Sequence, residues 1–235
     1  AGRMGQRIQR VLSDTYPQAN VTSFDQGDAL VFADLDVVID FSLPHATPSV
    51  VNALSASGAA LVSGVTGHSS EALGALQSLA KTHAVLTAAN FSLGVHVTSH
   101  LVRQAAQMLD ARFQVEIFER HHQFKKDLPS GTALFLGASA AQGRDQNWTD
   151  VYVDRQRTQA RQNAAEIGVS ALRGGSVIGA HSVHFLGVDE EIEIAHTATD
   201  RNVFASGAIR AAAWLVGQSP GRYTMDDFIT DTFTP

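Results

Sequence analysis

The chain has 235 residues, of which 44% are hydrophobic and 17% charged, an ordinary composition for a globular protein of one or two domains. It contains no cysteine, which excludes disulfides, thiolate metal sites and a cysteine nucleophile, and which fits a cytoplasmic protein. The net charge of −6 and the scattered basic residues argue against a nucleic-acid partner, which needs a basic face. No apolar run reaches the roughly 18 residues of a membrane-spanning helix, so we expect no membrane span.

Strand-like and helix-like segments alternate along the first half of the chain. Short apolar runs, which are typical of buried parallel strands, occur at 36–41, 59–62 and 84–87. Helical periodicity occurs before and between them, at 5–12, 48–56 and 70–82. This order predicts a parallel sheet with helices on its faces, which is a Rossmann-type domain of the α/β class.

The second half of the chain has a different pattern. A helix is predicted at 95–109, and residues 113–119 and 190–196 alternate between apolar and polar side chains, as strands with one wet face do. These strands predict a mixed sheet in a second, α+β domain. An alanine-rich helix follows at 202–216. We therefore predict a dinucleotide-binding domain from residues 1–92 plus 202–235, and a second domain at 93–201.

The beginning of the sequence does not match a complete domain of this kind. A glycine-rich turn at a nucleotide site normally follows the central strand of its sheet, and here nothing precedes Ala1. The stretch 17–35 is also short for a second strand and its connection. We therefore expect a further strand before Ala1, and further residues near 17–35, in the complete domain.

Three loops are candidates for binding a nucleotide cofactor. The segment Gly2-Arg3-Met4-Gly5 leads into a helix, whose free N–H groups and positive dipole end would bind a pyrophosphate. Each loop alone is equally well an ordinary turn or helix cap, but loops at the carboxyl ends of successive parallel strands would form one crevice. The other two loops, each after a predicted strand, are Gly64-Val65-Thr66 and Ala88-Ala89-Asn90-Phe91.

The segment 120–132 has the composition of a site for a small anion. His121, His122 and Lys125 belong to a cationic island in an acidic protein. We expect His121 and Lys125 to lie in a polar loop after the 113–119 strand, outside the core. The run Ser130-Gly131-Thr132 precedes an apolar segment and predicts a helix start, where hydroxyl and N–H groups bind a carboxylate well.

The same residues have other interpretations. A solvated pair of histidines and a plain N-cap at Ser130 would have the same sequence, and His121 and His122 near Asp127 could ligate zinc. The adjacent lysines would repel a cation, and no third histidine follows at ligand spacing, so we predict no metal. The glycine-rich stretches around Arg173 and His181 are interpreted as sheet construction.

Taken together, the motifs resemble the dihydrodipicolinate reductase family over nearly the whole chain. The stretch from Glu119-Arg-His-His122 to Pro129-Ser-Gly-Thr-Ala133, with Lys125 and Asp127 between, is its most specific part. The less specific motifs, in the family's order, are Gly2-Arg-Met-Gly5, Ile39-Asp-Phe-Ser42, Gly64-Val-Thr-Gly67, Ala89-Asn-Phe-Ser-Leu-Gly94, Arg173-Gly-Gly, Gly179-Ala-His181, and His196 with Arg201, Phe204 and Gly207-Ala208.

The resemblance implies a Rossmann-type domain, a mixed-sheet domain that forms a homotetramer, and a reductase that uses NADH or NADPH. The implied substrate is a small cyclic dicarboxylate, 4-hydroxy-tetrahydrodipicolinate, reduced to tetrahydrodipicolinate in the diaminopimelate and lysine pathway. By the same resemblance His121 is the acid/base residue and Lys125 its companion proton donor. The implied cofactor positions are the three loops above, and the substrate positions are His122, Ser130, Gly131 and Thr132.

Some residues depart from the family pattern, namely Leu43, Val65, Arg120 and Ala180. Asp25, 20 residues after Gly5, is our candidate for the acidic residue that ends a second strand and selects the cofactor. It leaves the preference between NADH and NADPH open. Another dehydrogenase would share the nucleotide loops without the 121–132 run, and a non-catalytic nucleotide-binding regulator would need neither His121 nor Lys125.

Overall fold

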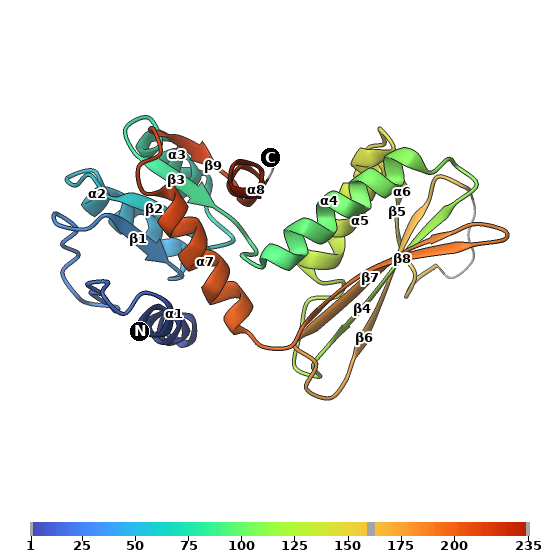
Figure 1. Ribbon diagram of the computed structural model, residues 1–235, viewed down its shortest axis with the longest axis horizontal. Helices are drawn as coiled ribbons and strands as arrows, with labels where there is room; N and C mark the ends of the chain where they lie inside the picture. The colour runs from blue at the N-terminus through green and yellow to red at the C-terminus, as the bar shows by residue number, and fades with distance from the viewer. Residues whose placement is uncertain (1, 159–162, 234–235) are drawn as a thin grey trace. The chain divides into compact units, whose positions relative to one another are not determined.

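The computed structural model describes residues 2–158 and 163–233, which fold into two compact units (Figure 1). The first unit comprises the chain up to Leu93 and the segment from Asn202 onward, and the second comprises Gly94–Arg201. Among the described residues, no helix is long and apolar enough to cross a membrane.

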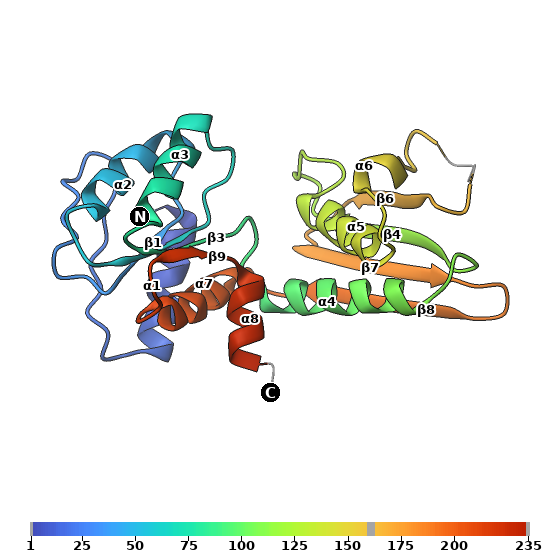
Figure 2. The ribbon, with the colours of Figure 1, turned by 90° about the horizontal axis from the view of Figure 1, so that it is seen from above.

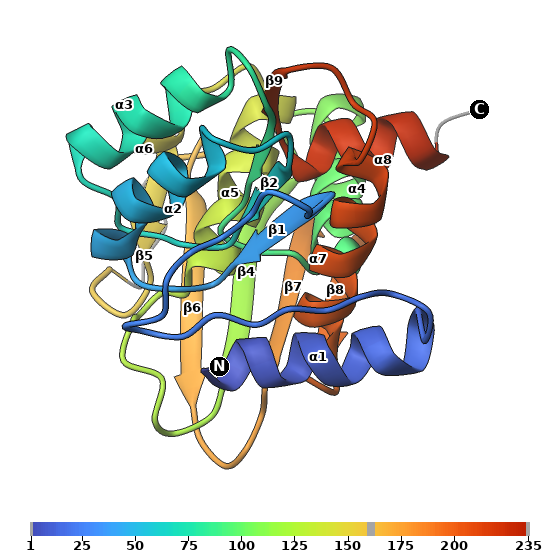
Figure 3. The same cartoon turned by 90° about the vertical axis from the view of Figure 1, so that its left-hand side faces the viewer.

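The first unit is built on a four-stranded parallel sheet in the order β1-β2-β3-β9. Alternate side chains of each strand face opposite layers of helices: Val62 packs on the side of α7 and α8, and Leu61 on the side of α2 and α3. Figure 3 shows these two helical layers with the sheet between them. The strands are β1 (Val37–Asp40), β2 (Ala60–Ser63), β3 (Ala84–Thr87) and β9 (Gly221–Tyr223), and the helices are α1 (Arg3–Thr15), the 3-10 turn η1 (Pro44–Ala46), α2 (Thr47–Leu54), α3 (Ser70–Leu79), α7 (Asn202–Leu215) and α8 (Met225–Phe233).

The second unit is built on a five-stranded mixed sheet in the order β5-β6-β4-β7-β8, in which β4 pairs parallel with β6 and antiparallel with β7. Helices cover one face of this sheet (Figure 2). The elements are α4 (Leu93–Met108), β4 (Gln114–His121), α5 (Gly131–Gly143), α6 (Trp148–Val151), β5 (Tyr152–Asp154), β6 (Ile167–Arg173), β7 (Gly179–Leu186) and β8 (Glu191–Ala198).

The alternation of β4 decides which of its side chains face the helices. Val115 and Ile117 belong to the core beneath α4 and α5. Because side chains two residues apart share a face, Glu119 and His121 continue this buried row toward the end of the strand. Phe118 points to the opposite face and is 40% exposed.

The predicted fold class, a Rossmann-type sheet domain plus a mixed-sheet domain, is confirmed. The expectation that Asp25 ends a strand is wrong, since the segment between α1 and β1 contains turns and irregular chain but no strand. This segment is held instead by Phe32, which is buried against the α2 and α3 layer. The patterns did not predict β9 and α8, because three residues of strand and nine of helix are too short for their periodicity to be read.

Candidate active site

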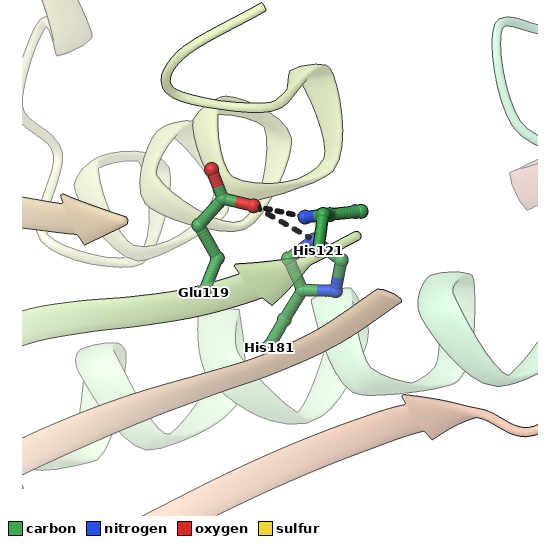
Figure 4. A group of neighbouring side chains, drawn as sticks. All are labelled: Glu119, His121 and His181. Atoms are coloured by element: carbon green, nitrogen blue, oxygen red, sulfur yellow. Dashed lines mark ion pairs between the residues drawn. The ribbon is translucent and has the colours of Figure 1, made fainter. Parts of the chain in front are cut away.

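The carboxyl end of β4 gathers polar side chains from three strands into the covered face of the second sheet. Glu119 lies opposite His181 of β7, and His121 lies opposite Arg173 of β6. Figure 4 shows the carboxylate of Glu119 directed toward the imidazoles of His121 and His181. All three residues are buried, and His121 is only 7% exposed. The expectation that His121 lies in a polar loop is therefore wrong: it is the last residue of the strand.

Glu119 is the centre of this cluster. Its carboxylate contacts Nδ1 of His121, and its Oε1 atom accepts hydrogen bonds from Nη2 of Arg173 at 2.8 Å and from the backbone N–H of Ser130 at 2.9 Å. Burial opposes ionisation of the carboxyl, but the hydrogen bonds from His121, Arg173 and Ser130 outweigh it and lower the pKa of Glu119 to about 2. Glu119 is therefore a buried, fully ionised carboxylate at neutral pH.

His181 is held beside this carboxylate without a charge of its own. Its Nε2 atom lies 3.1 Å from Oγ of Ser130 and 4.0 Å from Oε2 of Glu119, and its ring centroid lies 5.0 Å from that of His121. Burial, reinforced by the charge of His121, lowers the pKa of His181 to about 4. His181 is consequently neutral at pH 7.

Gly179 leaves room beside the other nitrogen of His121. A Cβ atom on this residue would lie 3.0 Å from Nε2 of His121, which is tighter than ordinary contact. With Nδ1 occupied by Glu119 and no side chain on Gly179, Nε2 is the nitrogen of His121 that remains available for chemistry.

The helix α5 begins at this cluster. Oγ of Ser130 caps it by accepting from the N–H of Ala133 at 3.2 Å, and Ser130 is almost fully buried. The predicted helix start is thus correct, but the Ser130 hydroxyl is committed to the helix and to His181. Gly131 is exposed and Thr132 half-buried, so the first turn of α5 reaches solvent through these two residues.

The loop after β4 contains two more of the predicted site residues, Lys125 and His122. Nζ of Lys125 lies 2.8 Å from Oδ2 of Asp127, and its side chain is 23% exposed. Nε2 of His122 lies 3.1 Å from Nη2 of Arg201, a residue that reasoning from the sequence did not place here. Burial and the nearby Arg201 charge lower the pKa of His122. Its Nε2 therefore accepts from the guanidinium, as a neutral imidazole does.

The residues that could hold a metal differ from those considered in the sequence. Donor atoms of Glu119, His121 and His181 lie within 4.8 Å of one another. However, Glu119 already accepts from the guanidinium of Arg173, and a second cation would compete with this bond. The carboxylate of Glu119 is thus already balanced by a cationic side chain of the protein.

Two of the three predicted cofactor loops follow β2 and β3 at one edge of the first sheet, and the third, Gly2–Gly5, is the beginning of α1. β1, β2 and β3 are parallel and in register, so their carboxyl ends adjoin. Phe41, just after β1, connects the loops: its ring packs against that of Phe91 at 5.5 Å, and it fills the space where a Cβ of Gly64 would lie, at 2.2 Å. Gly207 in α7 permits an equally close approach, since its Cβ would lie 1.7 Å from the carbonyl oxygen of Phe91.

These loops fit a dinucleotide by their backbone more than by their side chains. Among the described residues no side chain caps α1, whose N-cap is Gly2, so the first-turn amides of Arg3, Met4 and Gly5 remain for a phosphate. The side chain of Met4 packs against the Ile8 cluster. The remaining predicted cofactor residues differ in their exposure to solvent. Val65 and Phe91 are buried, Ala88 and Asn90 are half-buried, and Thr66, Ala89 and Asp25 are exposed.

Comparison with known proteins gives one consistent result. The family model described as dihydrodipicolinate reductase, N-terminus, matches residues 1–91, and the one described as dihydrodipicolinate reductase, C-terminus, matches residues 94–229. The chain is 42% identical to the 4-hydroxy-tetrahydrodipicolinate reductase of Caulobacter vibrioides over 242 residues, covering 97% of this chain and 93% of that protein. It is 46% identical to the enzyme of that name from Nitratiruptor sp. over 193 residues, covering 82% and 76%.

A solved structure shows the same fold. The dipicolinate-bound dihydrodipicolinate reductase from Paenisporosarcina sp. TG-14 superposes with a TM-score of 0.71 at 22% sequence identity, covering 97% of this chain and 96% of that one. At this identity the likeness establishes the architecture of the chain.

The ionisation of His181 predicts a loss of stability in mild acid. Its pKa is about 4 in the folded protein against 6.5 for an ordinary histidine, so the unfolded chain binds the proton more tightly. The free energy of unfolding therefore falls as the pH drops from about 6.5 to 4. Replacing His181 with Gln should reduce the difference in unfolding free energy between pH 7 and pH 5 by about 1–2 kcal/mol, as measured by urea denaturation. An unchanged difference would mean that the pKa of His181 is not lowered in the folded protein.

Proposed function

The chain belongs to the dihydrodipicolinate reductase family, and from its site we propose that His121 and Lys125 supply the proton of the reaction. The protein is a nicotinamide-nucleotide-dependent oxidoreductase that reduces 4-hydroxy-tetrahydrodipicolinate to tetrahydrodipicolinate, with loss of water, in diaminopimelate and lysine biosynthesis. The observation that carries the proposal is the buried contact of Glu119 with Nδ1 of His121, beside the first turn of α5.

The proton chemistry follows from the arrangement of His121. When bound, the nicotinamide supplies a hydride to the substrate, and the protein must supply a matching proton. Glu119 holds Nδ1 of His121 and favours its protonated form, which leaves Nε2 as the donor. A positioned general acid of this kind accelerates a reaction by about 10²–10⁴-fold. Lys125, an ammonium group in the loop that follows, is the companion donor.

We propose that the substrate's carboxylates are bound by the groups around the start of α5 and the loop after β4. The backbone of Gly131 and the side chain of Thr132 reach solvent at a helix N-terminus, which favours negative charge. His122 and the Arg201 guanidinium beside it form a second anion-binding pair. Ser130 supports this site indirectly, since its hydroxyl caps the helix on which Gly131 and Thr132 lie.

The proposed cofactor positions are the α1 first turn (Gly2, Arg3, Met4, Gly5), the loop Gly64-Val65-Thr66, and the loop Ala88-Ala89-Asn90-Phe91. Both NADH and NADPH are proposed as donors. Asp25 is the candidate selector: a carboxylate would accept from the ribose 2′-hydroxyl of NADH and repel the 2′-phosphate of NADPH. The supply of reduced nicotinamide nucleotides and the absence of cysteine favour the cytoplasm as the location, which fractionation of cells would test.

The central test is a coupled assay with dihydrodipicolinate synthase. Oxidation of NADH or NADPH, followed by absorbance, should begin only when the product of the synthase is supplied. Replacing Asp25 with Ala should raise the relative kcat/KM for NADPH if Asp25 selects the cofactor. Absence of turnover with either cofactor would contradict the function. An unchanged ratio of the two kcat/KM values in the Asp25→Ala variant would contradict only the role of Asp25.

Replacing either proposed proton donor should lower kcat and change KM less. His121→Gln keeps a polar group beside Glu119, and we expect kcat to fall by about 10²-fold or more, because proton donation is used in the transition state. Lys125→Ala should lower kcat as well, and the matched variant Lys126→Ala should not. A His121→Gln enzyme that turns over at the wild-type rate would show that the proton comes from elsewhere.

The start of α5 is tested by Thr132→Val, which keeps the size of the side chain and removes its hydroxyl. Loss of a hydrogen bond to a charged group costs about 1.5–3 kcal/mol, so KM for the substrate should rise by roughly 10–100-fold. KM for the nucleotide should stay unchanged. An equal rise in both constants would mean that Thr132 only stabilises the helix.

We propose a homotetramer assembled through the second sheet. The face of this sheet opposite α4 and α5 carries Phe118, 40% exposed, and Leu172, 53% exposed. Exposed large apolar side chains in one patch favour a protein contact. Light scattering at micromolar concentration should give the mass of four chains, and the mass of one chain would contradict the proposal.

A further inference from the structure

We infer that Glu119 is the positioning residue of this site, and that its single carboxylate fixes both the proton donor and the substrate-binding helix start. The inference rests on the proposed role of His121. Glu119 itself does not face the solvent, because its side chain is fully buried.

The two oxygens of Glu119 have different partners. One contacts Nδ1 of His121, and the other accepts the backbone N–H of Ser130 at 2.9 Å. Ser130 is the N-cap of α5, so one rigid group sets the distance between Nε2 of His121 and the first turn of the helix. Positioning of this kind matters because a displacement of about 1 Å between reacting groups can cost 10²-fold in rate.

Packing alone does not explain a glutamate at this position. The row that leads to it on β4, Val115 and Ile117, is apolar, and an apolar residue would continue the core beneath α5. A buried ion pair is often no more stabilising than apolar residues of the same volume. The carboxylate is therefore better explained by what it does to His121: it accepts the Nδ1 proton, selects the orientation of the ring and favours the imidazolium.

The same strand offers a matched control. Glu116, on the opposite face of β4, also binds an arginine, since Nη2 of Arg155 lies 2.7 Å from its Oε1 atom. The two glutamates lie on the same strand and each binds its own arginine, but only Glu119 contacts a histidine in the site. A variant of Glu116 thus reports what loss of an arginine-bound carboxylate does to the strand itself.

The experiment compares Glu119→Gln with Glu116→Gln in the coupled assay. The amide oxygen of Gln can still accept from Ser130 and Arg173, but its NH₂ group cannot accept from Nδ1 of His121. We expect Glu119→Gln to lower kcat by about 10–100-fold with a smaller change in KM, as for other groups that orient a functional histidine. Glu116→Gln should leave both constants near their wild-type values.

A double variant separates positioning from structure. If Glu119 acts through His121, Glu119→Gln should lower kcat in the wild-type background and cause no further loss in His121→Gln. An equal loss in both backgrounds would overturn the inference. Loss of activity in His121→Gln with full activity in Glu119→Gln would also overturn it while leaving the proposed function intact, and full activity in both would contradict the proposed function first.

The pH profile gives a further readout. Replacing Glu119 removes a charge that contacts His121, so the pH dependence of kcat should differ between Glu119→Gln and the wild type. The groups that face the pair are His181 and Arg173 on the neighbouring strands, His196 opposite His181 on β8, and Lys125 with Asp127 in the loop, and α5 adds no charged side chain. All of these groups are present in both the wild-type protein and the Glu119→Gln variant. A profile identical to that of the wild type would count against the inference.

Nitrogen NMR of histidine-labelled protein tests the contact without any assay. The wild-type protein should show His121 with its proton on Nδ1, and Glu119→Gln should remove that signature. Observation of an unprotonated Nδ1 in the wild type would overturn the inference even if the variant failed to fold.

Discussion

The site depends on a single buried charge, the carboxylate of Glu119. An unpaired ion inside a protein costs several kcal/mol, so the surrounding structure must supply partners. Here three elements do so: β6 supplies Arg173, the start of α5 supplies the N–H of Ser130, and β4 itself supplies His121. Each partner is thereby fixed relative to the other two. The requirement to satisfy one charge is what brings a strand end, a helix N-terminus and an imidazole to the same point.

In the first unit the constraint is steric. The loops after β1, β2 and β3 meet around the ring of Phe41, and this contact is possible because Gly64 has no Cβ atom. A side chain at Gly207 would overlap with the carbonyl oxygen of Phe91, and this clash would push α7 away from the loop after β3. The glycines therefore act on the backbone around a proposed cofactor site, while the side chains of Met4 and Phe91 serve the core.

Reasoning from the sequence predicted the sheet types and most of the elements, because apolar runs and alternation are local signals. It also placed the helix start at Ser130, since a hydroxyl before an apolar run is a local signal too. It missed the roles of Arg173 and His181, which lie far along the chain and join Glu119 only through strand pairing. It placed His121 in a polar loop because the alternation of β4 was ended at Glu119, two residues too early. The available signal was Glu119 itself, a charged residue in the apolar row of a strand.

The charges of the second unit also suit a dicarboxylate substrate. Glu119 and Arg173 cancel, as do Lys125 and Asp127. Among the groups proposed to face the substrate, a protonated His121 and the Arg201 guanidinium then carry two positive charges, opposite to the two negative charges of the proposed substrate. A charged His181 would add a third, within 5.0 Å of the His121 ring, and its burial prevents this at neutral pH. In the proposed reaction, donation of the His121 proton would reduce this positive charge by one. The neutral state of His181 and the ionised state of Glu119 are thus parts of one electrostatic arrangement around His121, one of the two proposed proton donors.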